Sequence, residues 1–241
     1  MKLAIPFLLF QLLFFLPSPV FAQFQDFLKG LDNASPFKSS SLNNGTIVSG
    51  LKEALTIGIE NTVQLTGSAG GYLKNEAIKI LLPPKLQSMD QALRLAGFGP
   101  QVDEFVIGMN RAAEQAAPLA KPIFQKAITN MSFEDAKKIL DGGDTAATDY
   151  FQSKTRDHLE EAFTPEVEKT LNQVGVVSQY NQLVGQYTSL PFVKSPSFDV
   201  NNYVVGKSLD GLFYTLAEEE KKIRTNPGAR VTDLLQKVFS R

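Results

Sequence analysis

The longest uninterrupted helical pattern in the chain is NYVVGKSLDGLFYTLAEEEKKIR, residues 202–224. Its apolar residues recur every three or four positions and form one stripe: Val205, Leu209, Leu212, Leu216 and Ile223. This spacing predicts an amphipathic α-helix, because positions three and four residues apart lie on the same helix face. The residues Asn226, Pro227 and Gly228 follow, and they predict that the helix ends there.

Similar stripes recur toward the N-terminus, and each ends at glycine or proline. The clearest of them consists of Leu51, Leu55, Ile59 and Thr62. Only residues 78–82 alternate between apolar and polar, and they do so weakly; one extended segment does not make a sheet. The pattern therefore predicts an all-α fold, a single compact domain of about nine helices with at most one short extended segment near Ile78 and Leu82.

Four local signals predict where individual helices begin or end. Pro118 removes a backbone donor, so the helix that begins near Pro100 must kink or restart there. Ser132 and Asp135 have the spacing of a capping box. Asp144 is expected to cap the helix that follows Gly142 and Gly143, and Thr164 with Pro165 is expected to start another.

The N-terminus has the pattern of a secretory signal peptide. Lys2 precedes an apolar run over residues 3–16, and Ala22 ends a short segment of the kind that signal peptidase cleaves. The alternative is an uncleaved membrane anchor, but a run of about 14 residues is shorter than the roughly 20 that span a bilayer. We expect cleavage between Ala22 and Gln23, export, and no transmembrane segment in the mature chain.

Three regions follow from this division. Residues 1–22 are the signal peptide, residues 23–48 an N-terminal segment and linker, and residues 49–241 the all-α domain. The N-terminal segment has a short apolar stripe made of Phe24, Phe27, Leu28 and Leu31. Residues 232–239 are expected to form a last short helix.

Composition excludes several classes of function. Among the 241 residues, 24 are Lys or Arg and 25 are Asp or Glu, so the net charge of −1 argues against a nucleic-acid-binding protein. The chain has no cysteine and a single histidine, His158, which excludes disulfides, thiolate metal sites and cysteine nucleophiles. No phosphate-binding glycine loop appears, and we expect neither a cofactor nor a metal.

Two predicted helices carry polar residues beside their apolar stripes. Glu219 and Glu220 flank the stripe of residues 202–224, and Arg224 follows Glu220 by four positions, the spacing of an ion pair along a helix. On the helix that begins near Pro100, Asn110 and Glu114 edge an alanine-rich stripe, and Arg111 points roughly opposite. The six residues are the candidate polar cluster.

Two interpretations of the candidate polar cluster remain open. The cluster could form a pocket suited to acid–base chemistry or to binding an anion. It could instead be a buried network of ion pairs that fixes how the helices pack, since an unpaired buried charge costs several kcal/mol.

Short motifs in order along the chain are similar to those of a known family. They are Gly50-Leu51-Lys52-Glu53-Ala54-Leu55, Gly71-Tyr72-Leu73, Met109-Asn110-Arg111-Ala112-Ala113-Glu114, Asp135-Ala136-Lys137-Lys138-Ile139-Leu140, Leu209-Asp210-Gly211-Leu212-Phe213 and Val238-Phe239. Over roughly residues 50–239 the chain resembles the bacterial domain-of-unknown-function 4197 family. The resemblance implies an exported bacterial protein, periplasmic if the host has two membranes, and it implies no activity.

Three functions are consistent with these observations. The first is a non-catalytic periplasmic protein that binds a protein partner or a small ligand in the cell envelope. The second is a periplasmic enzyme that uses the carboxylates of Glu114, Glu219 and Glu220. The third is an envelope-associated protein whose aromatic N-terminal segment contacts the membrane.

Overall fold

The structure is a computed structural model that describes residues 44–191, 193–229 and 232. These residues are helical without any β-strand, which confirms the all-α class, although they form fewer α-helices than the nine expected. The predicted signal peptide, the segment of residues 23–43 and the helix expected at residues 232–239 lie outside the described residues, apart from Thr232.

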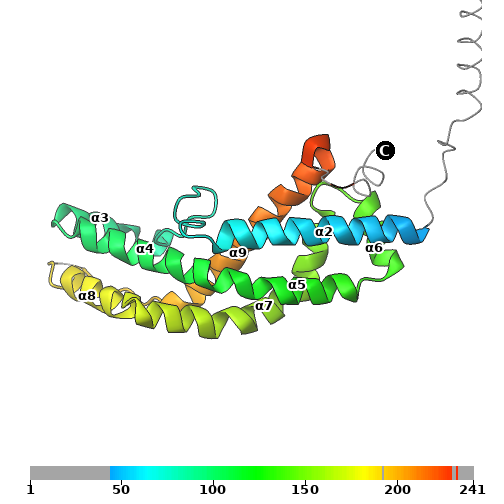
Figure 1. Cartoon of the computed structure of the whole chain (residues 1–241). Helices are drawn as coiled ribbons and strands as arrows, with labels where there is room; N and C mark the ends of the chain where they lie inside the picture. Colours follow the sequence, from blue (N-terminus) through cyan, green and yellow to red (C-terminus); the bar gives the residue numbers. More distant parts are fainter. Residues whose placement is uncertain (1–43, 192, 230–231, 233–241) are drawn as a thin grey trace, which may run out of the picture. The chain divides into compact units, whose positions relative to one another are not determined.

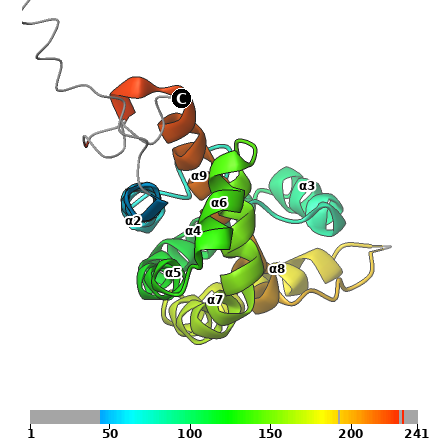
Figure 2. The ribbon, with the colours of Figure 1, turned by 90° about the vertical axis from the view of Figure 1, so that its right-hand side faces the viewer.

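The described residues form four long and four short α-helices. They are α2 (Asn44–Gly67), α3 (Gln87–Leu95), α4 (Gly99–Ala116), α5 (Ala120–Thr129), α6 (Phe133–Asp141), α7 (Ala146–Gln173), α8 (Val176–Thr188) and α9 (Val200–Thr225). Figure 1 shows α4 and α5 following one another, with α2 along one side and α7 along the other. In Figure 2, α2, α5 and α7 are seen nearly end-on, and α9 crosses behind α6.

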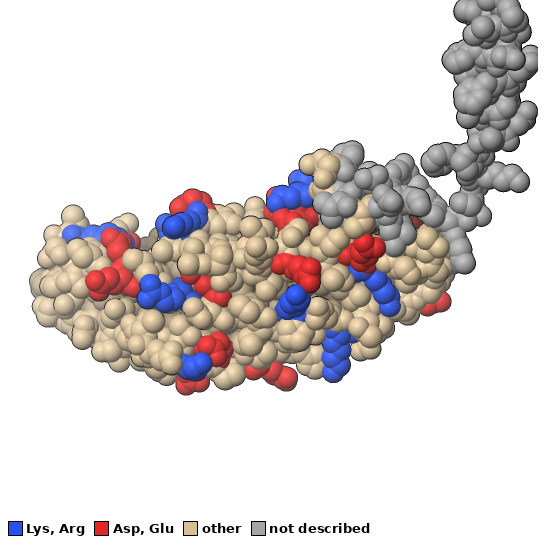
Figure 3. All heavy atoms as spheres, viewed as in Figure 1, with Lys and Arg blue, Asp and Glu red and all other residues tan. Residues whose placement is uncertain are grey.

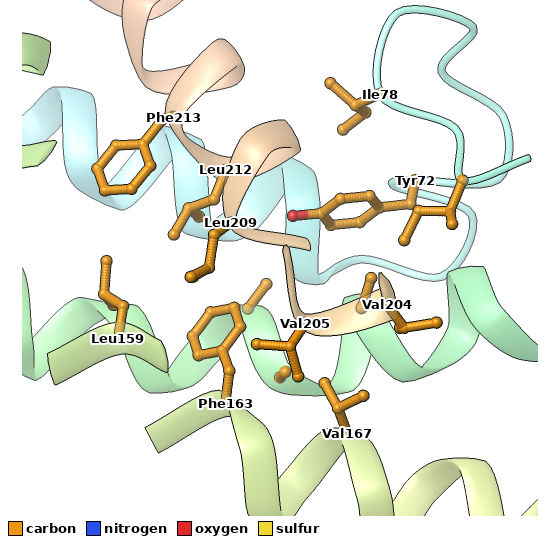
Figure 4. Packing of buried hydrophobic residues seen from close by; sticks show 14 of the residues in the cluster. Tyr72, Ile78, Leu159, Phe163, Val167, Val204, Val205, Leu209, Leu212 and Phe213 are labelled. Carbon is orange, nitrogen blue, oxygen red and sulfur yellow. The ribbon is translucent and has the colours of Figure 1, made fainter. Parts of the chain in front are cut away.

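Helix α9 is the element that the other long helices cover. It packs against α7, α2 and α4. The five apolar residues of its predicted stripe, from Val205 to Ile223, are all buried. Figure 4 shows Leu209 and Leu212 of α9 close to Leu159 and Phe163 of α7. Burial of side chains of this size provides about 1.5–3 kcal/mol each.

The loop between α2 and α3 inserts one aromatic ring into this core. Tyr72 is fully buried, and its ring points toward α9 (Figure 4). The ring can approach closely because residue 211 of α9 is glycine: a Cβ atom there would lie 2.6 Å from Cε1 of Tyr72. Residues 79–83 of the same loop are neither helix nor strand, so the extended segment expected near Ile78 and Leu82 does not form a β-strand.

Two of the predicted helix boundaries are confirmed. Helix α4 ends at Ala116, a 3₁₀ turn (η2, Ala117–Leu119) contains Pro118, and α5 begins at Ala120. The chain therefore restarts its helix at the proline that removes a donor. Ser132 and Asp135 form the predicted capping box at the start of α6.

The prediction of a new helix at Thr164 and Pro165 is wrong, because α7 runs without a break from Ala146 to Gln173. Phe163 and Val167 are both fully buried, so continuing the helix keeps both in the core, whereas Pro165 lies on the exposed face. The carbonyl that Pro165 leaves without a donor is that of Glu161, an exposed residue, and water can bind it there.

The first described helix also begins earlier than expected. Residues 44–48 were assigned to the linker because Asn44 and Gly45 are typical of turns, but α2 begins at Asn44. As for membranes, none of the helices that the structure describes combines the length and the apolar character needed to cross a bilayer.

Pro165→Ala is expected to raise the stability of the fold by about 1–3 kcal/mol, because alanine restores a helical hydrogen bond at an exposed position. Pro100→Ala is the matched control, since Pro100 is exposed in the first turn of α4, where proline costs nothing. Thermal melts of both variants measure the effect. A melting temperature of Pro165→Ala at or below that of the unsubstituted protein would contradict the account of α7.

Candidate functional site

Glu220 and Arg224 form a buried ion pair on α9, as their spacing predicted. Nε and Nη2 of Arg224 donate to Oε1 of Glu220 at 3.0 and 2.8 Å. The side chains are only 7% and 13% exposed. A pair this buried is stable only when further hydrogen bonds compensate both groups for the loss of water.

The Glu220 carboxylate finds those hydrogen bonds at the N-terminus of α7. The backbone N–H of Ala147 donates to Oε1 at 2.9 Å, and that of Thr148 donates to Oε2 at 2.8 Å. The hydroxyl of Thr148 donates to Oε2 as well, at 2.9 Å. The first N–H groups of a helix have no partner within the helix, and the helix dipole places partial positive charge there. Glu220 therefore caps α7 from another helix.

Arg224 binds the C-terminus of α6, the end of a helix with the opposite partial charge. Its Nη2 donates at 2.7 Å to the carbonyl of Ile139, one of the last residues of α6. The final carbonyls of a helix lack partners and carry partial negative charge. One ion pair thus binds the end of α6 and the start of α7, on either side of the turn at Gly142 and Gly143.

The expectation that Asp144 caps α7 is wrong. The N-cap residue is Thr145, whose hydroxyl donates to Oδ2 of Asp149 at 3.3 Å and does not cap a backbone N–H of the helix. Asp144 is exposed, whereas the first turn of α7 faces α9, so the buried amides take a buried acceptor from α9 instead. The sequence interval between Glu220 and Ala147 is 73 residues, which a local capping pattern cannot detect.

The partners of Glu219 are more exposed to solvent than those of Glu220. Its Oε2 accepts a hydrogen bond from Nδ2 of Asn61 on α2 at 3.0 Å, and its Oε1 accepts one from Nζ of Lys222 at 2.6 Å. The Glu219 side chain is buried, but that of Lys222 is 57% exposed. Glu219 therefore ties α9 to α2 at the edge of the core.

Asn110 pairs with the extended segment as a neighbouring strand would. Its Oδ1 accepts from the N–H of Ile80 at 2.8 Å, and its Nδ2 donates to the carbonyl of Ile80 at 2.8 Å. Nδ2 also donates to the carbonyl of Val106, one turn earlier on α4. Ile80 is buried, so without Asn110 both of its backbone groups would lack a partner.

Glu114 holds the same loop one helical turn further along α4. Its Oε1 accepts from the N–H groups of Tyr72 and Leu73, both at 3.2 Å. The hydroxyl of Tyr72 donates to the carbonyl of Ser208 on α9 at 2.6 Å. Burial raises the pKa of the Tyr72 phenol well above its usual value, and the nearby charges of Glu114 and Asp210 raise it further. Tyr72 is therefore a neutral donor that links loop and helix.

The candidate polar cluster does not converge on one point. Asn110 and Glu114 bind the loop, and Tyr72 links that loop to α9 at Ser208, while Glu220 lies twelve residues later, about 18 Å along the helix. Arg111 is exposed and makes no ion pair with any residue that the structure describes. The described residues also bring together no three His, Asp or Glu side chains able to bind a metal.

A surface cavity that the sequence did not reveal lies between α5 and α7, beside the start of α6. It has a volume of about 610 Å³. Its apolar part is formed by Ile123, Ala127 and Ala162, and its polar part includes Lys126, Lys154 and His158. We call it the α5–α7 groove. The three basic side chains come from two helices and are unremarkable in each, so only the packing of the helices brings them together.

The consecutive glutamates of α9 provide a matched test of these contacts. Glu220→Ala should cost about 3–5 kcal/mol, because it removes the carboxylate beside the Arg224 charge and leaves two α7 amides buried without their acceptor. Glu219→Ala should cost about 1–2 kcal/mol, since Lys222 can return to water. Glu218→Ala, at an exposed position, should change stability by less than about 0.5 kcal/mol.

Chemical denaturation of the three variants measures these costs. An equal loss of stability in all three variants would contradict the role of Glu220 as the cap of α7. So would a Glu220→Ala variant as stable as the unsubstituted protein.

Tyr72→Phe should cost about 1 kcal/mol at neutral pH through loss of the hydrogen bond to Ser208. It should also change the response to alkali. The unfolded phenol ionises near pH 10, while the folded one stays neutral, so the stabilisation from Tyr72 is complete below pH 10 and is lost as pH rises above it. Melts from pH 7 to 11 should show the unsubstituted protein losing stability more steeply than Tyr72→Phe. Parallel curves would contradict a buried neutral phenol.

Comparison with known proteins agrees with the motifs noted in the sequence. The model of a family described as "Protein of unknown function (DUF4197)" matches residues 41–240. No curated protein matches the chain, and no solved structure does either. Because the matched region spans most of the sequence, the chain belongs to the DUF4197 family.

Proposed function

We propose that this protein is a non-catalytic binding protein, exported to the periplasm, whose ligand site is the α5–α7 groove. The observation that carries the proposal is the state of the three carboxylates on which an enzyme would depend. Glu114, Glu219 and Glu220 are each bound by backbone amides or by polar side chains that hold helices and loops in place. A general acid or base needs an oxygen within reach of the substrate, and these carboxylates are engaged in structural contacts instead.

The groove has the size of a ligand site. Pockets that bind small molecules have volumes of about 300–1,000 Å³, and the lining of this groove combines apolar side chains with polar and charged ones. The hydroxyl of Tyr150 donates to the carbonyl of Ala127, so that ring acts as an apolar wall. Lys126 and Lys154 are exposed, and neither forms an ion pair with another residue in the described part of the chain. The two ammonium groups are thus available to an incoming anion.

The acidic residues around the groove are largely occupied. Asp135 accepts hydrogen bonds from the hydroxyl and the N–H of Ser132, which lower the pKa of its carboxyl, with a further contribution from the charge of Lys154. Glu161 lies with Oε2 3.7 Å from Nδ1 of His158. The ligand class that fits best is a small organic anion with an apolar tail.

The wider surface does not favour a polyanion. Figure 3 shows basic and acidic side chains interspersed over the face that it draws, as expected for a chain with nearly equal numbers of each. A nucleic-acid-binding surface gathers Lys and Arg on one face. The basic groups at the α5–α7 groove are few, which suits a single carboxylate or phosphate group.

Titration with octanoate, followed by amide chemical shifts in NMR spectra, tests the site. Saturable shifts are expected at Lys126, Asn130, Lys154 and His158, with smaller effects from uncharged octyl glucoside. Combined Lys126→Gln and Lys154→Gln substitutions should weaken binding about tenfold or more, the equivalent of 1.4 kcal/mol.

Lys74→Gln is the matched control, because Lys74 is exposed on the loop before α3, and it should leave octanoate binding unchanged. Shifts that do not saturate, or that respond equally to all the substitutions, would overturn the proposed site.

A further inference from the structure

A second surface cavity lies between α7 and α9, and we call it the α7–α9 groove. Arg156 pairs with Asp210 while Glu220 binds the start of α7, so the two helices run antiparallel and the groove follows their seam. The stretch of α7 from Ala147 to Arg156 extends about 13 Å. The volume of the groove is about 310 Å³, at the lower end of the range for small-molecule sites.

The apolar part of the groove includes one half-exposed aromatic ring. Phe213 is 5% exposed, and its ring packs edge-on against Phe124 in the core, so only the edge of the core is open to the groove. Tyr214 is 48% exposed beside it. Ala217 is the neighbour of Tyr214 on the surface of α9, and its methyl group is too small to cover the ring. Tyr214 thus offers apolar ring surface to a ligand.

The polar part of the groove can both donate and accept hydrogen bonds. Oδ2 of Asp149 accepts from the hydroxyl of Thr145 at 3.3 Å, and its carboxylate is exposed. The side chains of Gln152 and Tyr214 are exposed and make no hydrogen bond with any residue in the described ranges. An amide and a phenol each donate and accept, so a ligand here meets both kinds of group.

The charges at the α7–α9 groove balance one another. Asp210 accepts from Nη2 of Arg156 at 3.3 Å and from Nζ of Lys207 at 3.2 Å. Asp149 is the one further charged side chain among the described residues that line the groove. Two acidic and two basic groups therefore meet here. Neither an anion nor a cation finds a surplus of opposite charge, in contrast to the basic α5–α7 groove.

We propose that the α7–α9 groove binds a neutral sugar of about the size of a disaccharide. The hydroxyls of a sugar both donate and accept, which matches the carboxylate of Asp149, the guanidinium of Arg156 and the amide of Gln152. The face of a sugar ring carries C–H groups, which pack favourably on the negative π-face of an aromatic ring such as Tyr214. This site is separate from the α5–α7 groove and does not depend on the function proposed for it.

Titrations with maltose, cellobiose and chitobiose, followed by amide chemical shifts in NMR spectra, test the site. At least one of the three sugars should give saturable shifts at Asp149, Gln152 and Tyr214 at millimolar concentration. Tyr214→Ala should weaken that binding about tenfold or more, whereas Tyr214→Phe keeps the ring and should weaken it by less than about threefold. Gln152→Ala should weaken binding as well, because it removes an amide that bonds to hydroxyls.

Phe133→Ala is the matched control for the loss of an aromatic ring. Phe133 is 43% exposed at the start of α6 and does not line the groove, so its removal should leave sugar binding unchanged. The combined Lys126→Gln and Lys154→Gln substitutions should also leave it unchanged, which keeps the test of this site apart from that of the α5–α7 groove. Circular dichroism melts must show that each variant is folded. If Tyr214→Ala does not fold, Gln152→Ala and Tyr214→Phe decide.

Three results would overturn the proposal. The first is the absence of saturable shifts with all three sugars. The second is an equal loss of binding in Phe133→Ala and in the variants of Tyr214 and Gln152. The third is saturable shifts in the groove with tetramethylammonium but with none of the sugars, which would assign the groove to a cation held by Asp149 and the ring of Tyr214.

Discussion

The ion pair between Glu220 and Arg224 determines how three helices meet. Its carboxylate binds the free amides at the start of α7, and its guanidinium binds a carbonyl at the end of α6. A buried ion pair by itself is a weak source of stability, because removing two charges from water costs several kcal/mol per ion. Here the backbone groups of two helix ends compensate both charges, and each charge has the sign that the adjacent helix dipole favours. The turn between α6 and α7 is held in place by α9.

The need of buried backbone groups for hydrogen-bond partners also explains the polar residues of α4. Parts of the loop between α2 and α3 are buried although they are neither helix nor strand, so the buried amides and carbonyls there need partners. Asn110 binds both backbone groups of Ile80, and Glu114 accepts hydrogen bonds from the N–H groups of Tyr72 and Leu73. With the loop held in this way, the Tyr72 ring packs against Gly211 and its hydroxyl reaches α9. Four residues of the candidate polar cluster thus make two separate sets of contacts that satisfy the backbone, Asn110 with Glu114 and Glu220 with Arg224.

Local features were predictable from the sequence, and distant contacts were not. The stripe of α9, the break at Pro118 and the capping box at Ser132 each depend on residues within a few positions of one another. The pairing of Glu220 with Arg224 is also local, at four residues. The binding of Glu220 to α7 spans 72 or 73 residues and that of Asn110 to Ile80 spans 30, and no local pattern encodes them. The prediction that a helix begins at Pro165 was wrong because the burial of Phe163 and Val167 stabilises a continuous α7 by more than an exposed proline destabilises it.

The difference between local patterns and contacts of distant residues also explains why the candidate polar cluster was only partly predicted. Burial of Glu219 and Glu220 beside an apolar stripe could be anticipated from helix geometry, as could the pairing of Glu220 with Arg224, but their partners on other helices could not. Helix geometry also predicts that Arg111 points roughly opposite the alanine-rich stripe, and the residue is exposed. The α5–α7 groove depends on how α5 and α7 pack, so its basic residues gave no signal in the sequence.

The central claim is that an acidic side chain from α9 caps α7. Amide hydrogen exchange at Ala147 and Thr148, measured residue by residue by NMR, tests it most directly. Amides in the first turn of a helix ordinarily exchange fast because they have no partner within the helix. The capped amides of Ala147 and Thr148 are predicted to exchange as slowly as that of Phe151 in the core of α7, and far more slowly than that of Gln101 in the first turn of α4. Exchange at Ala147 and Thr148 as fast as at Gln101 would contradict the account.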